Sequence, residues 1–172
     1  ADGVETAAAW RAAVERKDGP SALLLTRQGL PVQDRNAQQL DDMARGGYIL
    51  LEPTSTPEAI IIATGSEIEV AVQAAKSLNS SGRALRVVSM PCTDIFAQQT
   101  EQYRDAVLPP NITKRIAIEA GITDAWYKYT GLNACVIGMH SFGASAPAGD
   151  LFKHFELDLD HVSATIQRYL GD

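Results

Sequence analysis

Four short apolar runs separated by helix-like segments constrain the fold more than any other feature of this chain. The runs read EAIIIAT, ALRVVSM, KRIAIEA and ACVIGMH, at residues 58–64, 84–90, 114–120 and 134–140. A strand that is apolar at nearly every position is buried on both faces, which is typical of a parallel sheet with helices on either side. An amphipathic segment at 66–82 predicts one of those helices. We therefore predict an α/β fold with a mostly parallel sheet.

Further elements follow the same alternation. A short strand is predicted over 47–52 (GYILLE), and a helix over 94–108 that ends at a pair of prolines. Two closing helices are predicted over 148–156 and 158–170. We find no internal repeat and no low-complexity tract in the 172 residues.

The first part of the chain has a different pattern. Residues 4–16 predict an amphipathic helix with Glu5 in its first turn, where an acidic side chain complements the helix dipole. The sequence KDGP ends this helix, and residues 21–26 then predict a buried strand that leads into Arg27. The polar segment after it, at 32–47, predicts a linker with one helical turn and a domain boundary.

Composition and charge exclude several classes of protein. The net charge of −6 and the pI of about 5.0 provide no basic field for nucleic acid or an anionic membrane surface. No apolar stretch is long enough to span a membrane, and no charged segment followed by an apolar one has the pattern of a signal peptide. Cys92 and Cys135 form no CxxC pair, which indicates reduced thiols in a cytoplasmic protein. Because the chain starts at Ala1 without Met, we expect a piece cut from a longer protein.

Ligands of open parallel sheets bind beyond the carboxyl ends of the strands, which directs attention to Thr64, Gly65 and Ser66. Gly65 permits a tight turn from strand to helix, and Ser66 with Glu69 predicts a capping box. The alternative is an anion site at the helix start. We favour the structural cap, because acidic side chains in the first helical turn repel a phosphate.

Two more strand ends deliver titratable groups. Glu119 would serve as a general base if burial raised its pKa, although such a residue more often caps a segment or pairs with a cation. His140 lies beside a hydroxyl and a glycine, but no GxSxG elbow accompanies it. None of the histidines has the spacing of a metal ligand.

Arg27 stands at the carboxyl end of the predicted strand 21–26. Its guanidinium has the right fork of donors to capture a phosphate or a carboxylate in two hydrogen bonds. An ion pair with an acidic residue of another domain would equally explain its position. The chemistry of the residue alone leaves both interpretations open.

Several long blocks of the sequence closely resemble the carboxyl-terminal part of the transketolase family and its near relative, dihydroxyacetone synthase. The resemblance runs in order over nearly the whole chain, and its blocks include DGPSALLLTRQGLP, ARGGYIL, IIIATGSEIEVAVQAA, RVVSMPCTDIF, IEAGITDAWYKYTG and IGMHSFGASAPAGDLFKHF.

The resemblance implies a particular architecture. Residues 1–31 look like the last helix and strand of the pyrimidine-binding domain, 32–46 like a linker and 47–172 like the whole carboxyl-terminal domain. That domain is expected to have three layers, α/β/α, around a mostly parallel five-stranded sheet with one antiparallel strand. The segment GYIL is the candidate for that antiparallel strand.

The resemblance also implies a function for the whole protein. It would be a cytoplasmic homodimer of the pentose phosphate pathway that requires thiamine diphosphate and Mg²⁺ or another divalent cation. It would move a two-carbon ketol unit between ketose and aldose phosphates. The triplet TRQ matches the family block SRQ, whose arginine binds the sugar phosphate, so Arg27 is the expected substrate-binding residue.

The resemblance assigns no catalytic, cofactor-binding or metal-binding residue to residues 1–172, so we expect this chain by itself to be inactive and to hold no cofactor. Its expected partners are the remainder of the enzyme and a second subunit, not nucleic acid or a membrane. The alternative is a non-catalytic dimerisation or regulatory module, with a small ligand near Thr64, Gly65, Ser66, Glu119 and His140.

Overall fold

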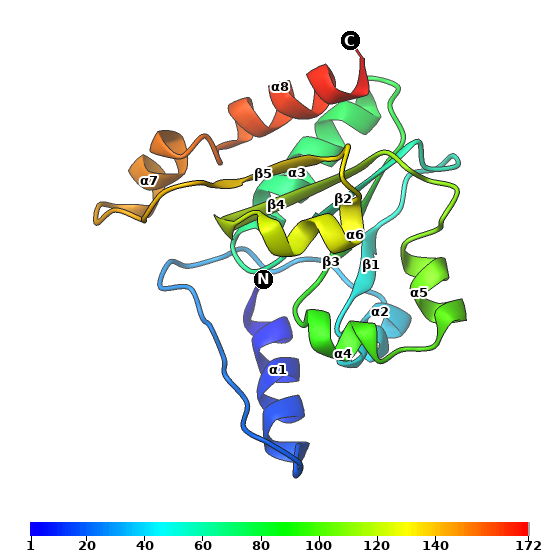
Figure 1. Ribbon diagram of the computed structural model, residues 1–172, viewed down its shortest axis with the longest axis vertical. Helices are drawn as coiled ribbons and strands as arrows, with labels where there is room; N and C mark the ends of the chain where they lie inside the picture. The colour runs from blue at the N-terminus through cyan, green and yellow to red at the C-terminus, as the bar shows by residue number, and fades with distance from the viewer. Residues whose placement is uncertain (172) are drawn as a thin grey trace.

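The computed structural model describes residues 1–171 and contains one five-stranded sheet (Figure 1). The strands lie in the order β1-β3-β2-β4-β5, and β1 pairs antiparallel with β3 whereas the other neighbours are parallel. The predicted sheet is therefore confirmed, including GYIL as its antiparallel strand. The strand bounds are β1 Tyr48–Leu51, β2 Ala59–Ala63, β3 Leu85–Ser89, β4 Arg115–Ile122 and β5 Cys135–Met139.

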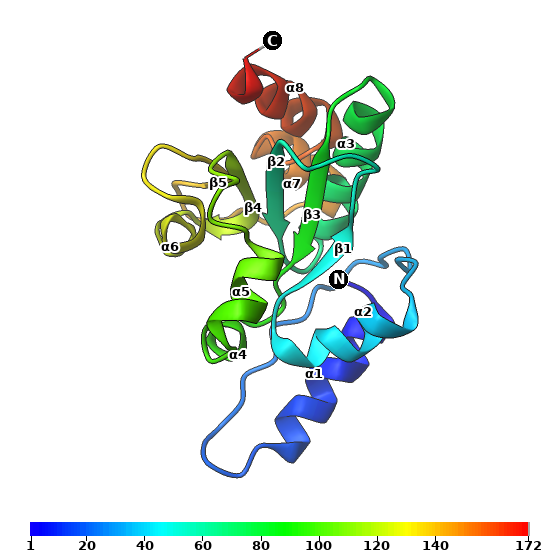
Figure 2. The same ribbon diagram turned by 90° about the vertical axis from the view of Figure 1, so that its right-hand side faces the viewer.

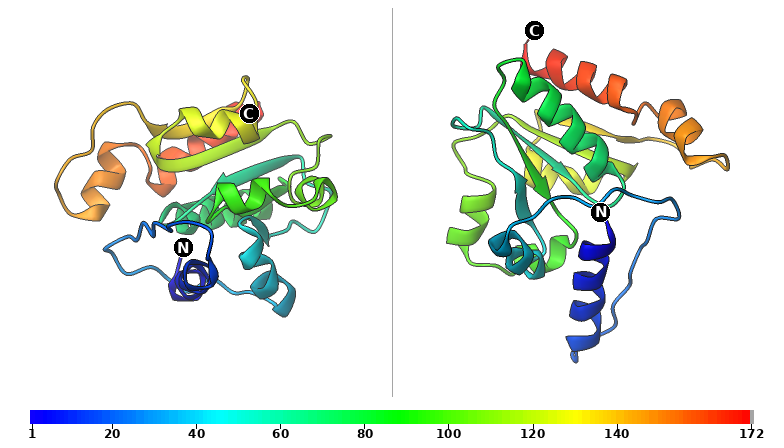
Figure 3. Two further views of the ribbon diagram at one scale, coloured as in Figure 1. Left: turned by 60° about the horizontal axis from the view of Figure 1, so that its bottom comes forward. Right: turned by 180° about the vertical axis from the view of Figure 1, so that it is seen from behind.

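Helices cover both faces of the sheet, which confirms the three predicted layers (Figures 2 and 3). Helices α3 and α8 pack on one face, and α4, α5 and α6 lie on the other. The helix bounds are α1 Gly3–Glu15, α2 Ala37–Asp42, α3 Glu67–Ser80, α4 Thr93–Ala97, α5 Glu101–Val107, α6 Tyr127–Thr130, α7 Ala148–His154 and α8 Leu159–Leu170, with 3-10 turns at Met43–Arg45 and Asp124–Trp126. No helix within 1–171 is long and apolar enough to cross a membrane.

The central strand β2 is completely buried, with an exposed fraction of 0% at each of its five residues. Alternate side chains enter different cores. Ile61 packs in the core beneath α3 and α8, while Ile60 and Ile62 pack with Phe96 of α4 on the opposite face. The apolar run that predicted a two-sided strand thus fills two separate cores.

The helix predicted over 94–108 is instead two short helices, α4 and α5. Thr100 interrupts it, because its backbone is non-helical and its side-chain oxygen accepts a hydrogen bond from the Tyr103 backbone N–H at 3.3 Å. A threonine in this role begins a new helix. Because of the break, α4 and α5 can both pack into the core on the same face of the sheet. Arg86 of β3 then donates to two backbone carbonyls in the last turn of α5.

The buried strand predicted over 21–26 is wrong for this chain. Residues 20–26 form no strand, and the side chains of Leu24 and Leu25 are 92% and 54% exposed. The backbone groups of a strand must form hydrogen bonds with a neighbouring strand, and no other segment of 1–171 pairs with this one. After α1 the segment runs back toward the start of that helix, as Figure 1 shows.

The segment predicted as a linker, 32–46, is packed against the sheet. Helix α2 begins with a capping box between Asn36 and Gln39, and Met43 is buried in the core. The Gln39 amide also donates to two carbonyls of β1, at 2.9 and 3.0 Å, which occupies acceptors on that edge strand. Gly46 follows with a φ of 81°, and a Cβ there would lie 2.4 Å from the Cys92 carbonyl oxygen.

We predict that Ile61→Ala lowers the free energy of unfolding by about 2–5 kcal/mol, because it leaves a cavity in a core that cannot collapse around β2. Ile122→Ala is the matched control, since Ile122 lies in β4 but is 72% exposed. It should cost less than about 0.5 kcal/mol. Urea denaturation of the 172-residue chain measures both values, and equal losses would contradict the assignment of the core.

Candidate functional site

The carboxyl ends of β2, β3 and β4 meet at a cleft of about 680 Å³. This is where an open parallel sheet is expected to bind a ligand. The cleft brings together two predicted residues, Thr64 after β2 and Glu119 near the end of β4. Other lining residues include Met90, Cys92, Asp94 and Trp126.

The remaining predicted crevice residues are not part of the lining. Among the residues that the structure describes, Gly65 and Ser66 lie outside the cleft, and His140 is an exposed residue just beyond β5. Two of the five residues predicted for a crevice therefore line this cleft, and ligand binding there stays a prediction. Strand order explains the difference for His140, because β5 is an edge strand that lies outside β2, β3 and β4, whose ends form the cleft.

The capping box predicted for Ser66 and Glu69 is wrong. Ser66 has helical dihedral angles and its hydroxyl makes no cap, but donates to the Glu67 carboxylate at 2.9 Å. The first turn forms instead through carbonyls of the preceding turn, since the Glu67 N–H bonds to the carbonyl of Thr64 at 3.3 Å. Gly65 permits this tight turn with a φ of 57°.

Two carboxyl groups dominate the electrostatics of this end of the sheet. Burial, together with the nearby Glu67 carboxyl, raises the pKa of Glu119 to about 7. Burial also raises the pKa of Glu67, which is only 4% exposed. The cleft lining also includes Asp94 and Asp124. Among the described residues, Lys128 is the one basic residue of that lining. This arrangement can hold or exchange a proton near neutral pH, and it disfavours an anionic ligand.

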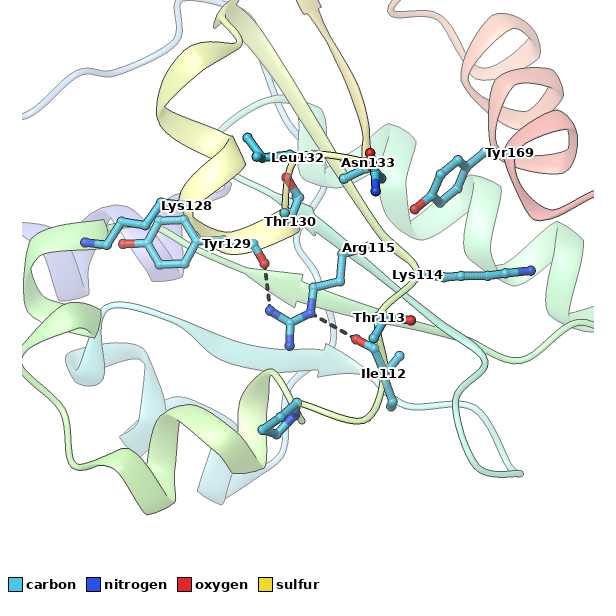
Figure 4. A pocket seen from close by; sticks show the side chains of 13 residues that line it. Ile112, Thr113, Lys114, Arg115, Lys128, Tyr129, Thr130, Leu132, Asn133 and Tyr169 are labelled. Atoms are coloured by element: carbon cyan, nitrogen blue, oxygen red, sulfur yellow. Dashed lines mark hydrogen bonds between the residues drawn. The ribbon is translucent and has the colours of Figure 1, made fainter.

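A second pocket of about 560 Å³ lies at the amino ends of β4 and β5 (Figure 4). At its centre, the Arg115 guanidinium donates to the carbonyls of Ile112 and Tyr129, at 3.1 and 2.7 Å. It also donates to the carbonyls of Leu108 and Pro109, each at 3.0 Å. These bonds tie the connection between α5 and β4, and helix α6, to the start of β4, so Arg115 has a structural role. The sequence signal for this role is the basic pair Lys114-Arg115 at the start of the strand.

Arg27 is exposed, and no hydrogen bond or ion pair joins it to another residue of 1–171. Exposed hydrophobic side chains occur on the same segment and on α1, at Trp10, Val14, Leu24, Leu25 and Val32. An apolar surface of this kind is typical of an interface with further protein.

Residues 46–158 match the family model described as the transketolase-like TK C-terminal domain. The chain belongs to the transketolase family. Transketolase 2 of Aliivibrio fischeri is 56% identical over 170 residues, which is 99% of this chain and 26% of that protein. Transketolase 1 of Vibrio cholerae is 57% identical over 161 residues, or 94% of this chain and 24% of that protein.

Solved transketolases have the same fold. A variant transketolase from Pichia stipitis matches 99% of this chain and 24% of its own with a TM-score of 0.89 at 35% identity. Transketolase from Leishmania mexicana matches the whole chain and 25% of its own with a TM-score of 0.86 at 37% identity. The chain therefore spans about a quarter of the length of the transketolases that it matches.

The resemblance of the sequence leads us to expect thiamine diphosphate and a divalent cation for the whole enzyme. The residues described here do not fit a metal site, because 1–171 contain no group of three His, Cys, Asp or Glu side chains that could hold an ion. We therefore assign no step of the reaction to either group on this chain.

The raised pKa of Glu119 predicts a pH-dependent stability. In the unfolded chain its pKa is about 4.3, so the folded state binds the proton more tightly. The resulting stabilisation is complete below about pH 4.3, and it is lost as the pH rises through about 7. Glu119→Gln should therefore gain stability over the parent chain between pH 5 and pH 8, by about 1–2 kcal/mol after allowance for solvent screening.

Urea denaturation at several pH values measures this difference. Glu101→Gln is the control, because it removes an exposed carboxylate from the first turn of α5. Its stability curve should stay parallel to that of the parent chain. A difference for Glu119→Gln that does not change with pH would contradict the burial of this carboxyl group.

Proposed function

We propose that this chain is the carboxyl-terminal quarter of a transketolase that moves a two-carbon ketol unit from a ketose phosphate to an aldose phosphate. The observation that carries the proposal is 56% identity to a transketolase over 99% of the chain. The whole enzyme would be a cytoplasmic homodimer of the pentose phosphate pathway that requires thiamine diphosphate and Mg²⁺ or another divalent cation.

The proposed division of the chain follows the family. Residues 1–31 are the end of the pyrimidine-binding domain, 32–46 the linker and 47–172 the carboxyl-terminal domain. Two observations support it. The family model begins its match at residue 46. The exposed apolar side chains of α1 and of residues 20–32 fit a segment that completes its core with preceding chain.

Within this chain, Arg27 is the proposed substrate-binding residue. Its exposed guanidinium has no partner among residues 1–171, so its donors are available for a phosphate. Two parallel N–H···O bonds would fix the phosphate end of the sugar, and thereby the distance of its reacting end from the cofactor-binding part of the enzyme. Arg27 would bind and orient the substrate, without taking part in bond making.

The regulatory alternative has less support. A cleft does lie at the strand ends, with Thr64 and Glu119 in its lining. Its excess of carboxyl groups disfavours the sugar phosphates and nucleotides that would be the natural effectors of such an enzyme. We therefore favour a structural contribution of residues 47–172 to the transketolase subunit.

We predict that Arg27→Ala in the full-length enzyme lowers kcat/KM for phosphorylated sugars by about 10- to 150-fold, mainly through KM. This range corresponds to loss of a charge-assisted contact worth about 1.5–3 kcal/mol. Steady-state kinetics with an aldose phosphate and with the same aldose lacking its phosphate measure the effect. Activity with the second acceptor should be unchanged, and an equal loss with both acceptors would point to structural damage. Arg27→Lys keeps the charge without the fork and should fall in between.

We also predict that the 172-residue chain alone binds no thiamine diphosphate and has no transketolase activity. Isothermal titration calorimetry with thiamine diphosphate and Mg²⁺ should give only the heat of dilution. The full-length enzyme under the same conditions is the positive control. Saturable heat from the isolated chain would refute the assignment of the cofactor site to other parts of the enzyme.

A further inference from the structure

A buried polar cluster joins the beginning of the chain to the sheet. It consists of Asp2, Glu5, Arg35, Tyr48 and Ser89, and we call it the Glu5 cluster. The exposed fractions of Asp2, Glu5, Tyr48 and Ser89 are 5%, 3%, 0% and 0%, and the Arg35 side chain is 1% exposed. Polar groups buried to this degree require specific partners.

The sheet contributes two hydroxyl groups to the cluster. Tyr48 of β1 and Ser89 of β3 are direct partners in the antiparallel ladder. Both donate to the same carboxylate oxygen of Glu5, the Tyr48 hydroxyl at 2.8 Å and the Ser89 hydroxyl at 2.5 Å. The first turn of α1 is therefore fixed to two neighbouring strands.

Arg35 connects the same hydroxyl to the residues that follow Arg27. Its Nε donates to the Tyr48 oxygen at 2.8 Å, and its Nη1 donates to Asp2 at 2.7 Å. Asp2 also accepts the backbone N–H of Gln33 at 2.8 Å, and its second oxygen caps α1. The Tyr48 hydroxyl is thus the link between Glu5 on one side and Arg35 on the other.

These contacts hold both ends of residues 5–33 at one place on the sheet. We call this segment the arm; it comprises most of α1 and the return segment, and it projects below the sheet in Figure 1. Arg27 lies within the arm. Within the part of the chain that the structure describes, the Glu5 cluster is the hydrogen-bonded connection between the ends of the arm and the strands.

Within the described part of the chain, the cluster contains one buried donor that is not hydrogen-bonded. Arg35 Nη2 is buried and makes no hydrogen bond within 1–171, and it lies 3.9 Å from the Glu5 carboxylate. Loss of the Tyr48 hydroxyl would leave Glu5 with one hydroxyl donor and Arg35 Nε without its acceptor. A buried ion pair with missing partners shifts to a new arrangement or admits water. Either change moves the base of the arm.

We propose that the Glu5 cluster sets the position of Arg27 for the sugar phosphate, which makes Tyr48 a positioning residue of the transketolase reaction. The inference rests on the proposed function, because it takes Arg27 as the phosphate ligand. It adds that the carboxyl-terminal domain contributes to phosphate recognition through two hydroxyl groups that never touch the substrate.

The test uses Tyr48→Phe in the full-length enzyme, which keeps the ring and removes the bridging hydroxyl. Expected is a three- to tenfold rise in KM for an aldose phosphate, with KM for the same aldose without phosphate changed less than twofold. Tyr103→Phe is the matched control, since its hydroxyl donates to the Gly47 carbonyl at 2.9 Å and makes no contact with the arm. It should change neither KM value. An equal effect of Tyr48→Phe on both acceptors, or none on either, would overturn the inference.

A double-mutant cycle with Arg27→Ala separates this inference from the proposed function. If Tyr48 acts through Arg27, Tyr48→Phe has no further effect on KM once Arg27 is alanine. Additive effects would overturn the positioning role while leaving Arg27 as the phosphate ligand. If Arg27→Ala itself shows no preference between the two acceptors, the proposed role of Arg27 fails first. Should Tyr48→Phe not fold, Ser89→Ala removes the smaller hydroxyl donor to Glu5 and must show the same selective rise in KM.

Discussion

The complete burial of β2 is the constraint on which the rest of the structure depends. No side chain of Ala59–Ala63 is exposed, so both faces of the strand need a helical layer, and its backbone needs a strand on each side. β3 and β4 meet this need in parallel, and parallel neighbours require helical crossovers. The carboxyl ends of three strands consequently meet at one edge, where the acidic cleft lies. The topology of the sheet therefore explains why a cleft is present there, whether or not a ligand binds in it.

Elements whose burial is determined by nearby residues could be predicted from the sequence. The five strands of the sheet and helices such as α3 and α8 agree with their predicted ranges to within one or two residues. The break at Thr100 was missed, because one side-chain hydrogen bond outweighs a continuous helical pattern. The strand at 21–26 failed for a different reason. Three successive leucines indicate burial, but a strand exists only where another segment pairs with it.

The candidate site likewise has a part that could be predicted from the sequence and a part that could not. The rule for strand ends located the cleft and placed Thr64 and Glu119 beside it. Arg27 could be interpreted only through resemblance, since the chemistry of the residue left phosphate and ion pair equally open. The Glu5 cluster escaped prediction, because Glu5 lies 43 residues from Tyr48 and 84 from Ser89. In the sequence, an acidic residue in the first turn of a helix is already explained by the helix dipole, and nothing prompts a search for distant partners.

The buried hydroxyls of Tyr48 and Ser89 also bear on modularity. The match to the family's carboxyl-terminal domain begins at residue 46, but the carboxylate that accepts both hydroxyl hydrogen bonds belongs to Glu5. A recombinant enzyme that joins this carboxyl-terminal domain to the front of another relative at residue 46 keeps the donors and exchanges their acceptor. Such a hybrid would keep this junction only if the relative's front part also supplied a carboxylate at the place of Glu5, even though each half retained its own core. A crossover placed ahead of Asp2 transfers the donors and the acceptor together.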